Sequence, residues 1–356
     1  MSKLCRQVSI ESPDVSRNCV FNFIVPVPET PPNGARIQIV YAGACYRPRN
    51  RSFSTEQSDP LPVPSPAIRE GAIFPGYEVA GIVETLGSDV STSSNIYIGQ
   101  RVIIYPFEDL PAGYAELIVV PDIKYLIPVP DELPLEIAAM LPTGALIAMN
   151  AILHAREIIE KRGDGCRLLI VGTGGLALWA VRLAAYFFRT KVEVNVAVLR
   201  DEGFLLTKDM ANIKTVQWNE ATYEPQLIER TINTCGGKVD VVVDFGTTSR
   251  SLHRSIRCLN ENGVVLISDE IAEKTAPKFS RLSEESKAEI LPISPGSIEQ
   301  LKELVGLISD KKIDPPPHSV FPYEEAAEVV KKLCTSQIVG RAILRFPDLE
   351  SNRITC

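Results

Sequence analysis

The sequence lacks the features that mark membrane proteins and nucleic-acid-binding proteins. No stretch reaches the roughly 18 uninterrupted apolar residues of a membrane span. The nearest, Leu135–Leu153, is interrupted by Glu136, Pro142, Thr143 and Asn150. The net charge is −7, the pI is near 5.3, and lysine and arginine form no block. Because nucleic acids and anionic membranes are bound through such blocks, we expect neither as a partner.

Cysteine and histidine are present but scattered, which excludes several kinds of site. The eight cysteines include no C-x-x-C pair, so a structural zinc site of the four-cysteine kind is excluded. The first residues, MSKLCRQVSIESPD, lack the apolar core of a signal peptide, so we expect a cytoplasmic protein with reduced thiols. The three histidines lie far apart and in no ligand pattern: His154, His253 and His318.

The most informative segment that is present is Arg167–Ala185, RLLIVGTGGLALWAVRLAA. An apolar run leads into closely spaced glycines, and apolar residues then recur at helical spacing, which predicts strand, tight turn and helix. Such a turn places unpaired backbone N–H groups and the positive end of a helix dipole where a pyrophosphate can bind. Gly172 lets the chain turn, Gly174 lets the backbone approach the phosphates, and Ala177 completes G-x-G-x-x-G/A. The alternative is a packing turn that binds no ligand.

The chain changes character along its length. Residues 1–130 hold β-branched stretches that alternate at period two, which predicts a β-rich part. From Arg167 to about Ile293, apolar strands alternate with helical stretches, which predicts an α/β fold with a parallel, doubly wound sheet. If the closing segment packs on the β-rich part, one domain is discontinuous in sequence. The active site would then lie in the cleft between the domains, beside the carboxyl ends of the central strands.

Several segments, in this order, resemble the medium-chain dehydrogenase/reductase superfamily, which holds alcohol and polyol dehydrogenases, quinone reductases and trans-enoyl reductases. The segments are FPGYEVAGIVETLGSDV, IGQRVIIY, GYAELIVVP, AAMLPTGALIAMNAI, GTGGLALWAVRLAA, VDVVVDFGTTS, NGVVLIS, FPYEEAAEVVKKL and IVGRAIL. The resemblance implies a GroES-like catalytic domain at residues 1–148, a Rossmann domain at 149–293 and a return segment at 294–356 that completes the catalytic domain. It also implies a homodimer or homotetramer that acts on a small molecule.

Most residues that hold the catalytic metal in zinc-dependent members are replaced in this chain. The resemblance implies three ligands: a Cys in the first strand region, a His in a G-H-E segment, and a Cys or Glu further on. Cys45 is present, but Tyr77 stands in place of the His and Thr143 in place of the third ligand. Glu78 follows Tyr77 and matches the Glu of the G-H-E segment. Because Cys45 and Glu78 alone cannot make a site with three protein ligands, we expect no zinc. Arg47 replaces the Ser or Thr that relays a proton in those enzymes.

Zinc-free members suggest a different set of catalytic residues. They transfer hydride between a nicotinamide and a polarised C=C or quinone, which needs positioning and a proton donor more than a metal. The resemblance implies that Tyr46 and Tyr77 face the cleft, where a phenol can hydrogen-bond a carbonyl and donate the proton. We therefore predict Tyr77, Tyr46 and Cys45 as catalytic residues. The alternative for each tyrosine is a core or cleft-lining aromatic residue.

The choice of nicotinamide cofactor is predicted from the end of the second Rossmann strand. An acidic residue there favours NAD, because it hydrogen-bonds the adenosine ribose. Here the strand VNVAVL ends at Leu199 and is followed by Arg200, a residue that can pair with the 2′-phosphate of NADP. We expect NADP. If Asp201 points at the ribose instead, the preference reverses to NAD.

The other cofactor contacts are predicted from motifs. The resemblance implies that Arg341, in IVGRAIL, points at the pyrophosphate, and the alternative is a surface charge on the last strand. Residues that follow or end Rossmann strands would line the ribose and nicotinamide. The predicted cofactor-binding residues are Gly172, Gly174, Gly175, Leu176, Arg200, Gly246, Thr247, Ser268 and Arg341.

Three hypotheses for the function follow. The leading one is a zinc-independent, NADP-preferring oxidoreductase that acts on an activated carbonyl, quinone or C=C bond. The second is a non-catalytic relative that binds nucleotide and has a regulatory or interaction role, motivated by the loss of two metal ligands and the proton relay. The third is a zinc-dependent alcohol dehydrogenase with an atypical site.

Overall fold

A computed structural model of the chain describes residues 4–10, 20–44, 78–107, 114–172, 174–199, 201–207, 210, 213–218, 222–246, 248–334 and 337–347. The chain forms two compact units: Met1–Thr143 with Pro317–Cys356, and Gly144–Pro316. None of the helices that the structure describes combines the length and the apolar composition needed to span a bilayer.

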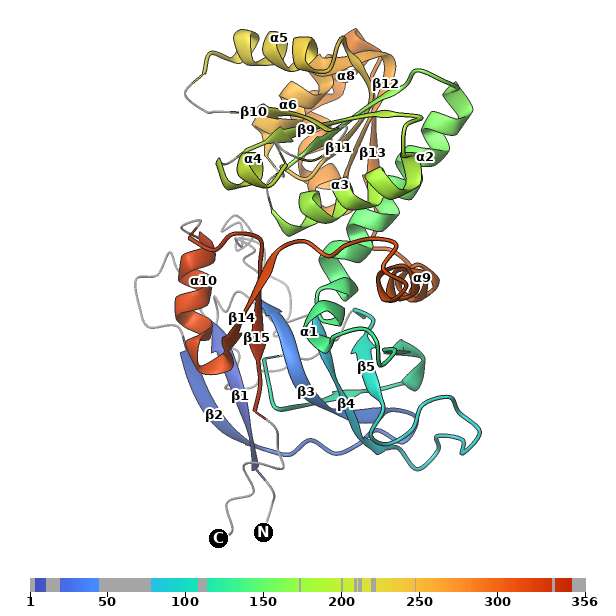
Figure 1. The fold of residues 1–356 in the computed structure, drawn as a ribbon, viewed down its shortest axis with the longest axis vertical. Coiled ribbons are helices and arrows are strands. Elements are labelled where there is room, and N and C mark those ends of the chain that lie inside the picture. Colours follow the sequence, from blue (N-terminus) through green and yellow to red (C-terminus); the bar gives the residue numbers. More distant parts are fainter. Residues whose placement is uncertain are drawn as a thin grey trace, which may run out of the picture. The chain divides into compact units, whose positions relative to one another are not determined.

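The first unit is built on a seven-stranded sheet in the order β14-β15-β3-β4-β5-β7, with β6 paired to β3 (Figure 1). A separate antiparallel pair is formed by β1 (Leu4–Ile10) and β2 (Val20–Pro26). The strands of the sheet are β3 (Ala35–Ala44), β4 (Val79–Leu86), β5 (Arg101–Ile104), β6 (Leu117–Val120), β7 (Leu126–Pro128), β14 (His318–Pro322) and β15 (Arg341–Arg345). Its short helices are η1 (Ile123–Tyr125), α1 (Leu135–Ala138), η4 (Tyr323–Glu325) and α10 (Ala326–Cys334), and η2 (Leu141–Ala145) spans the junction with the second unit.

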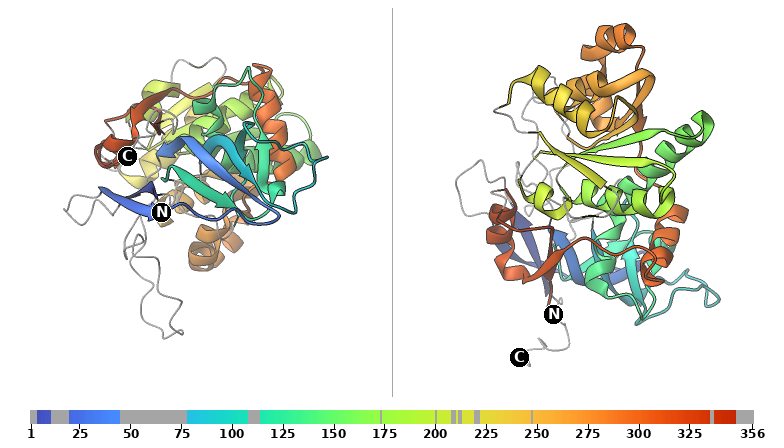
Figure 2. Two further views of the ribbon diagram at one scale, coloured as in Figure 1. Left: turned by 90° about the horizontal axis from the view of Figure 1, so that it is seen from below. Right: turned by 45° about the horizontal axis from the view of Figure 1, so that its top comes forward.

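Strand β3 shows how this sheet follows from the sequence. Its buried positions alternate at Ala35, Ile37 and Ile39, as expected for a strand with one face on a core. β15 runs antiparallel to β3, with Ala342 opposite Ala44 and β14 alongside in parallel (Figures 1 and 2). The sheet is therefore completed by strands that come from the far end of the chain.

The second unit holds a six-stranded parallel sheet in the order β10-β9-β8-β11-β12-β13. Helices α2 and α3 cover one face, and α5, α6 and α8 cover the other (Figure 1). The strands are β8 (Arg167–Val171), β9 (Glu193–Val198), β10 (Ile213–Gln217), β11 (Val239–Asp244), β12 (Leu259–Ser268) and β13 (Glu289–Ile293). The helices are α2 (Leu146–Arg162), α3 (Gly175–Phe188), α4 (Asp201–Thr207), α5 (Glu224–Thr234), α6 (Ser249–Cys258), α7 (Asp269–Thr275), η3 (Ala276–Phe279), α8 (Ser280–Ser286) and α9 (Ile298–Ser309).

The α/β class and the doubly wound parallel sheet predicted from the sequence are confirmed. The strand order reverses between β8 and β11, which is the point where nucleotides bind in sheets of this kind. The units divide at residues 143/144 and 316/317, where the sequence predicted 148/149 and 293/294. Helix α9 explains the larger difference, because it packs on α2 and buries Leu301, Leu304 and Val305 within the second unit.

Candidate functional site

The carboxyl ends of β8, β9 and β11 meet at the glycine turn predicted from the sequence. The Gly172 N–H donates to the Ala197 carbonyl at 2.9 Å, and the Phe245 N–H donates to the Val171 carbonyl at 2.8 Å. Helix α3 begins at Gly175, directly beyond the turn. The backbone therefore ties the turn to both neighbouring strands.

Gly172 is required by the conformation and the packing of the chain. Its φ is +148°, which residues with a side chain rarely adopt. A Cβ at this position would lie 3.1 Å from the Cβ of Ala177 and 3.2 Å from the Cβ of Phe245. The close approach explains the small residue at position 177, because α3 packs here directly against the end of β8.

Gly174 differs, because nothing in the described chain requires a glycine there. Its φ is −80°, and no atom of the described residues lies within 4 Å of the place that a Cβ would take. Gly174 is also the N-cap of α3 and supplies no side-chain oxygen to the N–H groups of the first turn. Gly174 is exposed and Gly175 and Leu176 are half-buried, so among the described residues the start of the helix is accessible. Its backbone donors and positive dipole end suit an anionic ligand.

Sheet register brings the other predicted residues of the second unit to the same edge. Val171, Asp244 and Ile267 lie opposite one another on β8, β11 and β12. The residues that follow them are therefore at the carboxyl edge, and they include Gly172, Gly246 and Ser268. All three are among the residues predicted from the sequence to bind the cofactor, and the structure brings them together.

Asp244 organises the turn after β11. It is buried, its Oδ1 accepts the Gly246 N–H at 2.7 Å, and its Oδ2 accepts the Ser255 hydroxyl at 2.9 Å. Burial raises the pKa of the Asp244 carboxyl to about 6, although hydrogen bonds from Gly246, Ser255 and Ser251 act in the opposite direction. A Cβ at Gly246 would lie 2.6 Å from the Ser251 side chain, so this turn also needs glycine.

Asp244 was missed by the sequence analysis, although the sequence contains a signal for it. An acidic residue ends the apolar run VDVVVD just before a glycine. A carboxylate at the end of a buried strand needs hydrogen-bond donors, and the next turn and helix supply them.

The first unit contains a buried cluster around Glu78, which is 1% exposed. The Thr143 hydroxyl donates to its Oε1 at 2.5 Å, and the Arg341 guanidinium donates to its Oε2. Arg341 opens β15 and is itself buried, so it is not a surface charge on the last strand. The Gly43 N–H donates to the Glu78 carbonyl at 2.7 Å, and a Cβ at Gly43 would overlap the Glu78 carboxylate.

In the Glu78 cluster, the buried carboxylate is paired with a buried guanidinium. One carboxylate oxygen accepts from a hydroxyl and the other from a guanidinium, so a cation bound to Glu78 would lie beside a positive charge. Within the described ranges, no group of three or more His, Cys, Asp or Glu side chains is placed to hold a metal ion. The predicted contact of Arg341 with a pyrophosphate stays a prediction.

Five predicted residues lie outside the described residues: Cys45, Tyr46, Tyr77, Arg200 and Thr247. The first three are the predicted catalytic residues, and the last two are predicted cofactor contacts. Their roles stay predictions.

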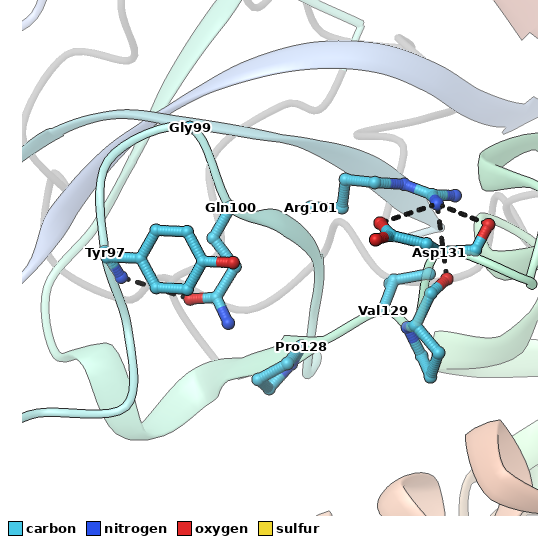
Figure 3. A pocket seen from close by; sticks show the side chains of 8 residues that line it. Tyr97, Gly99, Gln100, Arg101, Pro128, Val129 and Asp131 are labelled. Carbon is cyan, nitrogen blue, oxygen red and sulfur yellow. Dashed lines mark hydrogen bonds and ion pairs between the residues drawn. The ribbon is translucent and has the colours of Figure 1, made fainter.

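The first unit also has a pocket of about 360 Å³ between the loop before β5 and the end of β7 (Figure 3). The Arg101 guanidinium there donates to the Pro130 and Asp131 carbonyls at 3.2 and 2.9 Å and lies 3.5 Å from the Asp131 carboxylate. The Gln100 side chain accepts the Tyr97 N–H. No predicted site residue lines this pocket, and its arginine is already paired, so it is not our candidate site.

Two protein-family models match the chain. The model described as "Alcohol dehydrogenase GroES-like domain" matches residues 31–131, and the model described as "Zinc-binding dehydrogenase" matches residues 221–344. The first match confirms the GroES-like assignment of the β-rich part.

Individual relatives agree with these matches. The zinc-type alcohol dehydrogenase-like protein C1773.06c of Schizosaccharomyces pombe is 25% identical over 81% of this chain and 84% of its own length. The NADP-dependent alcohol dehydrogenase C of Mycobacterium bovis is 26% identical, but the match spans 43% of this chain and about half, 49%, of that protein.

A solved structure shows the same fold over nearly the whole chain. The quinone oxidoreductase from Coxiella burnetii has a TM-score of 0.71 at 23% identity, covering 97% of this chain and 100% of that one. The two family matches, the relatives and this fold agree with the strand order and the glycine turn. The chain therefore belongs to the medium-chain dehydrogenase/reductase superfamily of oxidoreductases.

Proposed function

We propose that this protein is a zinc-independent oxidoreductase that binds NADP and transfers hydride between its nicotinamide and an activated carbonyl, quinone or C=C bond. The observation that carries the proposal is the open space at Gly174, in front of an α3 N-terminus that has no side-chain cap. The backbone N–H groups of Gly175 and Leu176 would hold the pyrophosphate there, as at other helix N-termini that bind phosphates.

Further residues of the same edge would contact the rest of the cofactor. Gly246 and Ser268 end or follow β11 and β12, and we propose that they line the nicotinamide half together with Thr247. Arg200 follows β9 by two positions and would pair with the 2′-phosphate. The NADP-dependent relative supports this preference over the matched part of the chain.

We propose that the first unit holds no catalytic zinc ion, and two observations support this. The carboxylate of Glu78 already binds the Thr143 hydroxyl and the Arg341 guanidinium. Tyr77 and Thr143 stand where the resemblance implies a His and a further ligand, and neither is a usual zinc ligand. The proposed reaction therefore uses no metal ion.

The protein itself must supply orientation and a proton. A bound reduced nicotinamide supplies the hydride. We propose Tyr77 or Tyr46 as the donor of the proton to the substrate, with Cys45 beside them in the sequence motif. The proposed substrate is a small molecule, and the family relationship supports a homodimer or homotetramer.

A pair of glycine substitutions tests the proposal on the full chain. Gly174→Ala adds a methyl group in open space at the turn, and Gly306→Ala adds one in open space on α9, so both variants keep the fold. NADPH and NADH binding are followed by fluorescence. We expect Gly174→Ala to weaken NADPH binding about ten-fold or more, because the methyl group occupies the path of the pyrophosphate. Gly306→Ala is expected to bind as the wild type does.

The same samples are assayed for turnover of quinones, enals and ketones and analysed for metal. Turnover without bound zinc supports the proposal. A wild-type protein that binds neither NADPH nor NADH overturns it, as does zinc-dependent turnover. Tight nucleotide binding without turnover of any substrate would instead favour the non-catalytic, nucleotide-binding alternative.

A further inference from the structure

We propose that Asn150 is a positioning residue for the nicotinamide half of the cofactor site, an inference that rests on the function proposed above. The glycine turn after β8 takes the pyrophosphate, and the end of β9 takes the adenosine. The nicotinamide half then lies over the carboxyl ends of β11, β12 and β13. Asn150 holds the chain at the end of β13.

Asn150 is a polar residue on the buried face of α2. Its neighbours Ala148, Met149, Ala151 and Ile152 are fully buried, and Asn150 itself is 6% exposed. A buried amide is costly unless its donor and its acceptor are both paired. The Asn150 amide donates one hydrogen bond and accepts another, so its side chain is held in one orientation between two partners.

The donor of Asn150 fixes the residue that follows β13. Its Nδ2 donates to the Ser294 carbonyl at 2.9 Å. Ser294 comes directly after Ile293, which lies opposite Ser268 in the paired strands β12 and β13. The hydrogen bond therefore acts at the sheet edge where Ser268 is predicted to contact the cofactor.

The Asn150 contact attaches an exposed residue of the chain, Ser294, to α2. Pro292 and Pro295 flank it, and neither has a backbone N–H to donate. Pro292, Ser294 and Pro295 are all exposed, so burial holds them weakly. The Asn150 amide supplies a fixed attachment to a helix at this point.

The acceptor of Asn150 fixes the far end of the same connection. Gln300 donates from Nε2 to the Asn150 Oδ1 at 3.0 Å, and its own Oε1 accepts the Ser297 N–H at 2.8 Å. Ser297 and Gln300 form the capping box that begins α9. Between them and Ser294 lies Gly296, where a Cβ would approach Leu146 of α2 to 2.6 Å. One side chain thus ties both ends of the β13–α9 connection to α2.

The proposal predicts a loss of affinity confined to one half of the cofactor. Asn150→Ala removes both hydrogen bonds and frees the Ser294 carbonyl, while the glycine turn and β9 keep their contacts. We expect NADPH binding to weaken about ten-fold, while binding of 2′,5′-ADP, which lacks the nicotinamide, stays within about two-fold of the wild type. The fluorescence of bound NADPH is expected to shift, because it reports the surroundings of the nicotinamide.

Two further variants provide a control and a second test. Asn195→Ala removes another buried asparagine of the second unit. Asn195 donates to the Leu168 and Glu193 carbonyls and lies three positions before the carboxyl end of β9. The Asn195→Ala variant controls for general destabilisation, and we expect it to bind both ligands as the wild type does. Gln300 is half-buried, and Gln300→Ala leaves the hydrogen bond from Asn150 to Ser294 in place. This variant replaces Asn150→Ala as the test if Asn150→Ala fails to fold. We expect it to weaken NADPH binding about two- to three-fold and to leave 2′,5′-ADP binding unchanged.

The full chain and its variants are titrated with NADPH and 2′,5′-ADP by calorimetry. The temperature is one at which circular dichroism shows every variant to be folded. A selective loss of NADPH affinity in Asn150→Ala supports the proposal. Equal losses for NADPH and 2′,5′-ADP, or no loss for either, overturn it while leaving the proposed function intact. If the folded wild type binds neither NADPH nor NADH, the proposed function fails and this inference fails with it.

Discussion

The glycine turn of the second unit leaves a helix N-terminus without a side-chain cap, whereas the Glu78 cluster of the first unit contains a buried ion pair. At the turn, α3 begins without a side-chain cap and its N-cap residue, Gly174, is exposed. At Glu78, a buried carboxylate accepts hydrogen bonds from a hydroxyl and from a buried guanidinium. The first arrangement is open to an anion, and the second is closed to a cation. The difference agrees with the proposal that the turn binds a ligand, and it predicts that the cluster contributes to stability.

The largest effect is expected when the ion pair of the Glu78 cluster is broken. Arg341→Met leaves the buried Glu78 carboxylate without its cationic partner, so the free energy of unfolding should fall by about 3–5 kcal/mol. Denaturant unfolding of the variant measures the loss. The double variant Glu78→Gln with Arg341→Met should regain most of it, because no buried charge is left unpaired. A loss below about 1 kcal/mol would contradict the closed arrangement.

The next effect is a pH dependence of stability caused by the Asp244 carboxyl. Burial raises the pKa of this carboxyl from 3.8 to about 6. A group with a raised folded pKa favours the folded state at low pH, and this contribution is lost as the pH rises through the folded pKa. Asp244→Asn removes the dependence. The stability of the variant relative to the wild type should therefore rise between pH 4 and pH 7, by up to about 3 kcal/mol.

Urea unfolding at several pH values, with wild type and variant compared at each, checks the Asp244 prediction. The difference between the two proteins is the relevant quantity, because other carboxyl groups titrate in both. Hydrogen bonds to Gly246 and Ser255 stay possible for an asparagine side chain. A difference in stability that does not change with pH would contradict the prediction.

A third effect separates two glycines of one turn. Gly172→Ala forces a side chain into φ +148° and against Ala177 and Phe245, so we expect a stability loss of about 2 kcal/mol. Gly174→Ala meets open space and should change the stability by less than about 0.5 kcal/mol. Thermal unfolding of the two variants measures both. Equal losses would remove the distinction between a structural and a ligand-facing glycine.

The smallest effect sharpens the comparison at Glu78. Thr143→Val keeps the shape of the side chain but removes the hydroxyl that donates to Glu78, at a cost of about 1.5 kcal/mol. Thr143→Ser keeps the hydroxyl and is the matched control, with a smaller expected loss. If both variants unfold at the same denaturant concentration, the hydroxyl contributes nothing to the cluster.

The parts of the structure that depend on local patterns could be predicted from the sequence. The alternation of strands and helices predicted the parallel sheet, and the glycine spacing predicted the turn at Gly172, because both are set by residues close together in the chain. Gly246 and Ser268 could be placed at the same edge, since parallel strands bring their carboxyl ends together.

The parts that depend on distant contacts could not be predicted. Glu78 and Arg341 meet although 263 positions separate them, and no local pattern carries that information. Asn150 and Ser294 are 144 positions apart, and the sequence analysis treated Asn150 only as an interruption of an apolar run. The boundary at 316/317 depends on the packing of α9 against α2. The predicted catalytic residues stay predictions.

The pairing of β15 with β3 has a consequence for synthesis of the chain. The ribosome makes β3 early, then the whole of the second unit, and only afterwards the strands that complete the sheet of the first unit. The second unit is continuous and can fold as it emerges, because a domain generally folds as a unit during translation. The edge of β3 that receives β15 stays without that partner until β15 is made. Completion of the first sheet is therefore a late step that follows synthesis of the second unit, and it is the stage at which chaperones have an unfinished strand edge to protect.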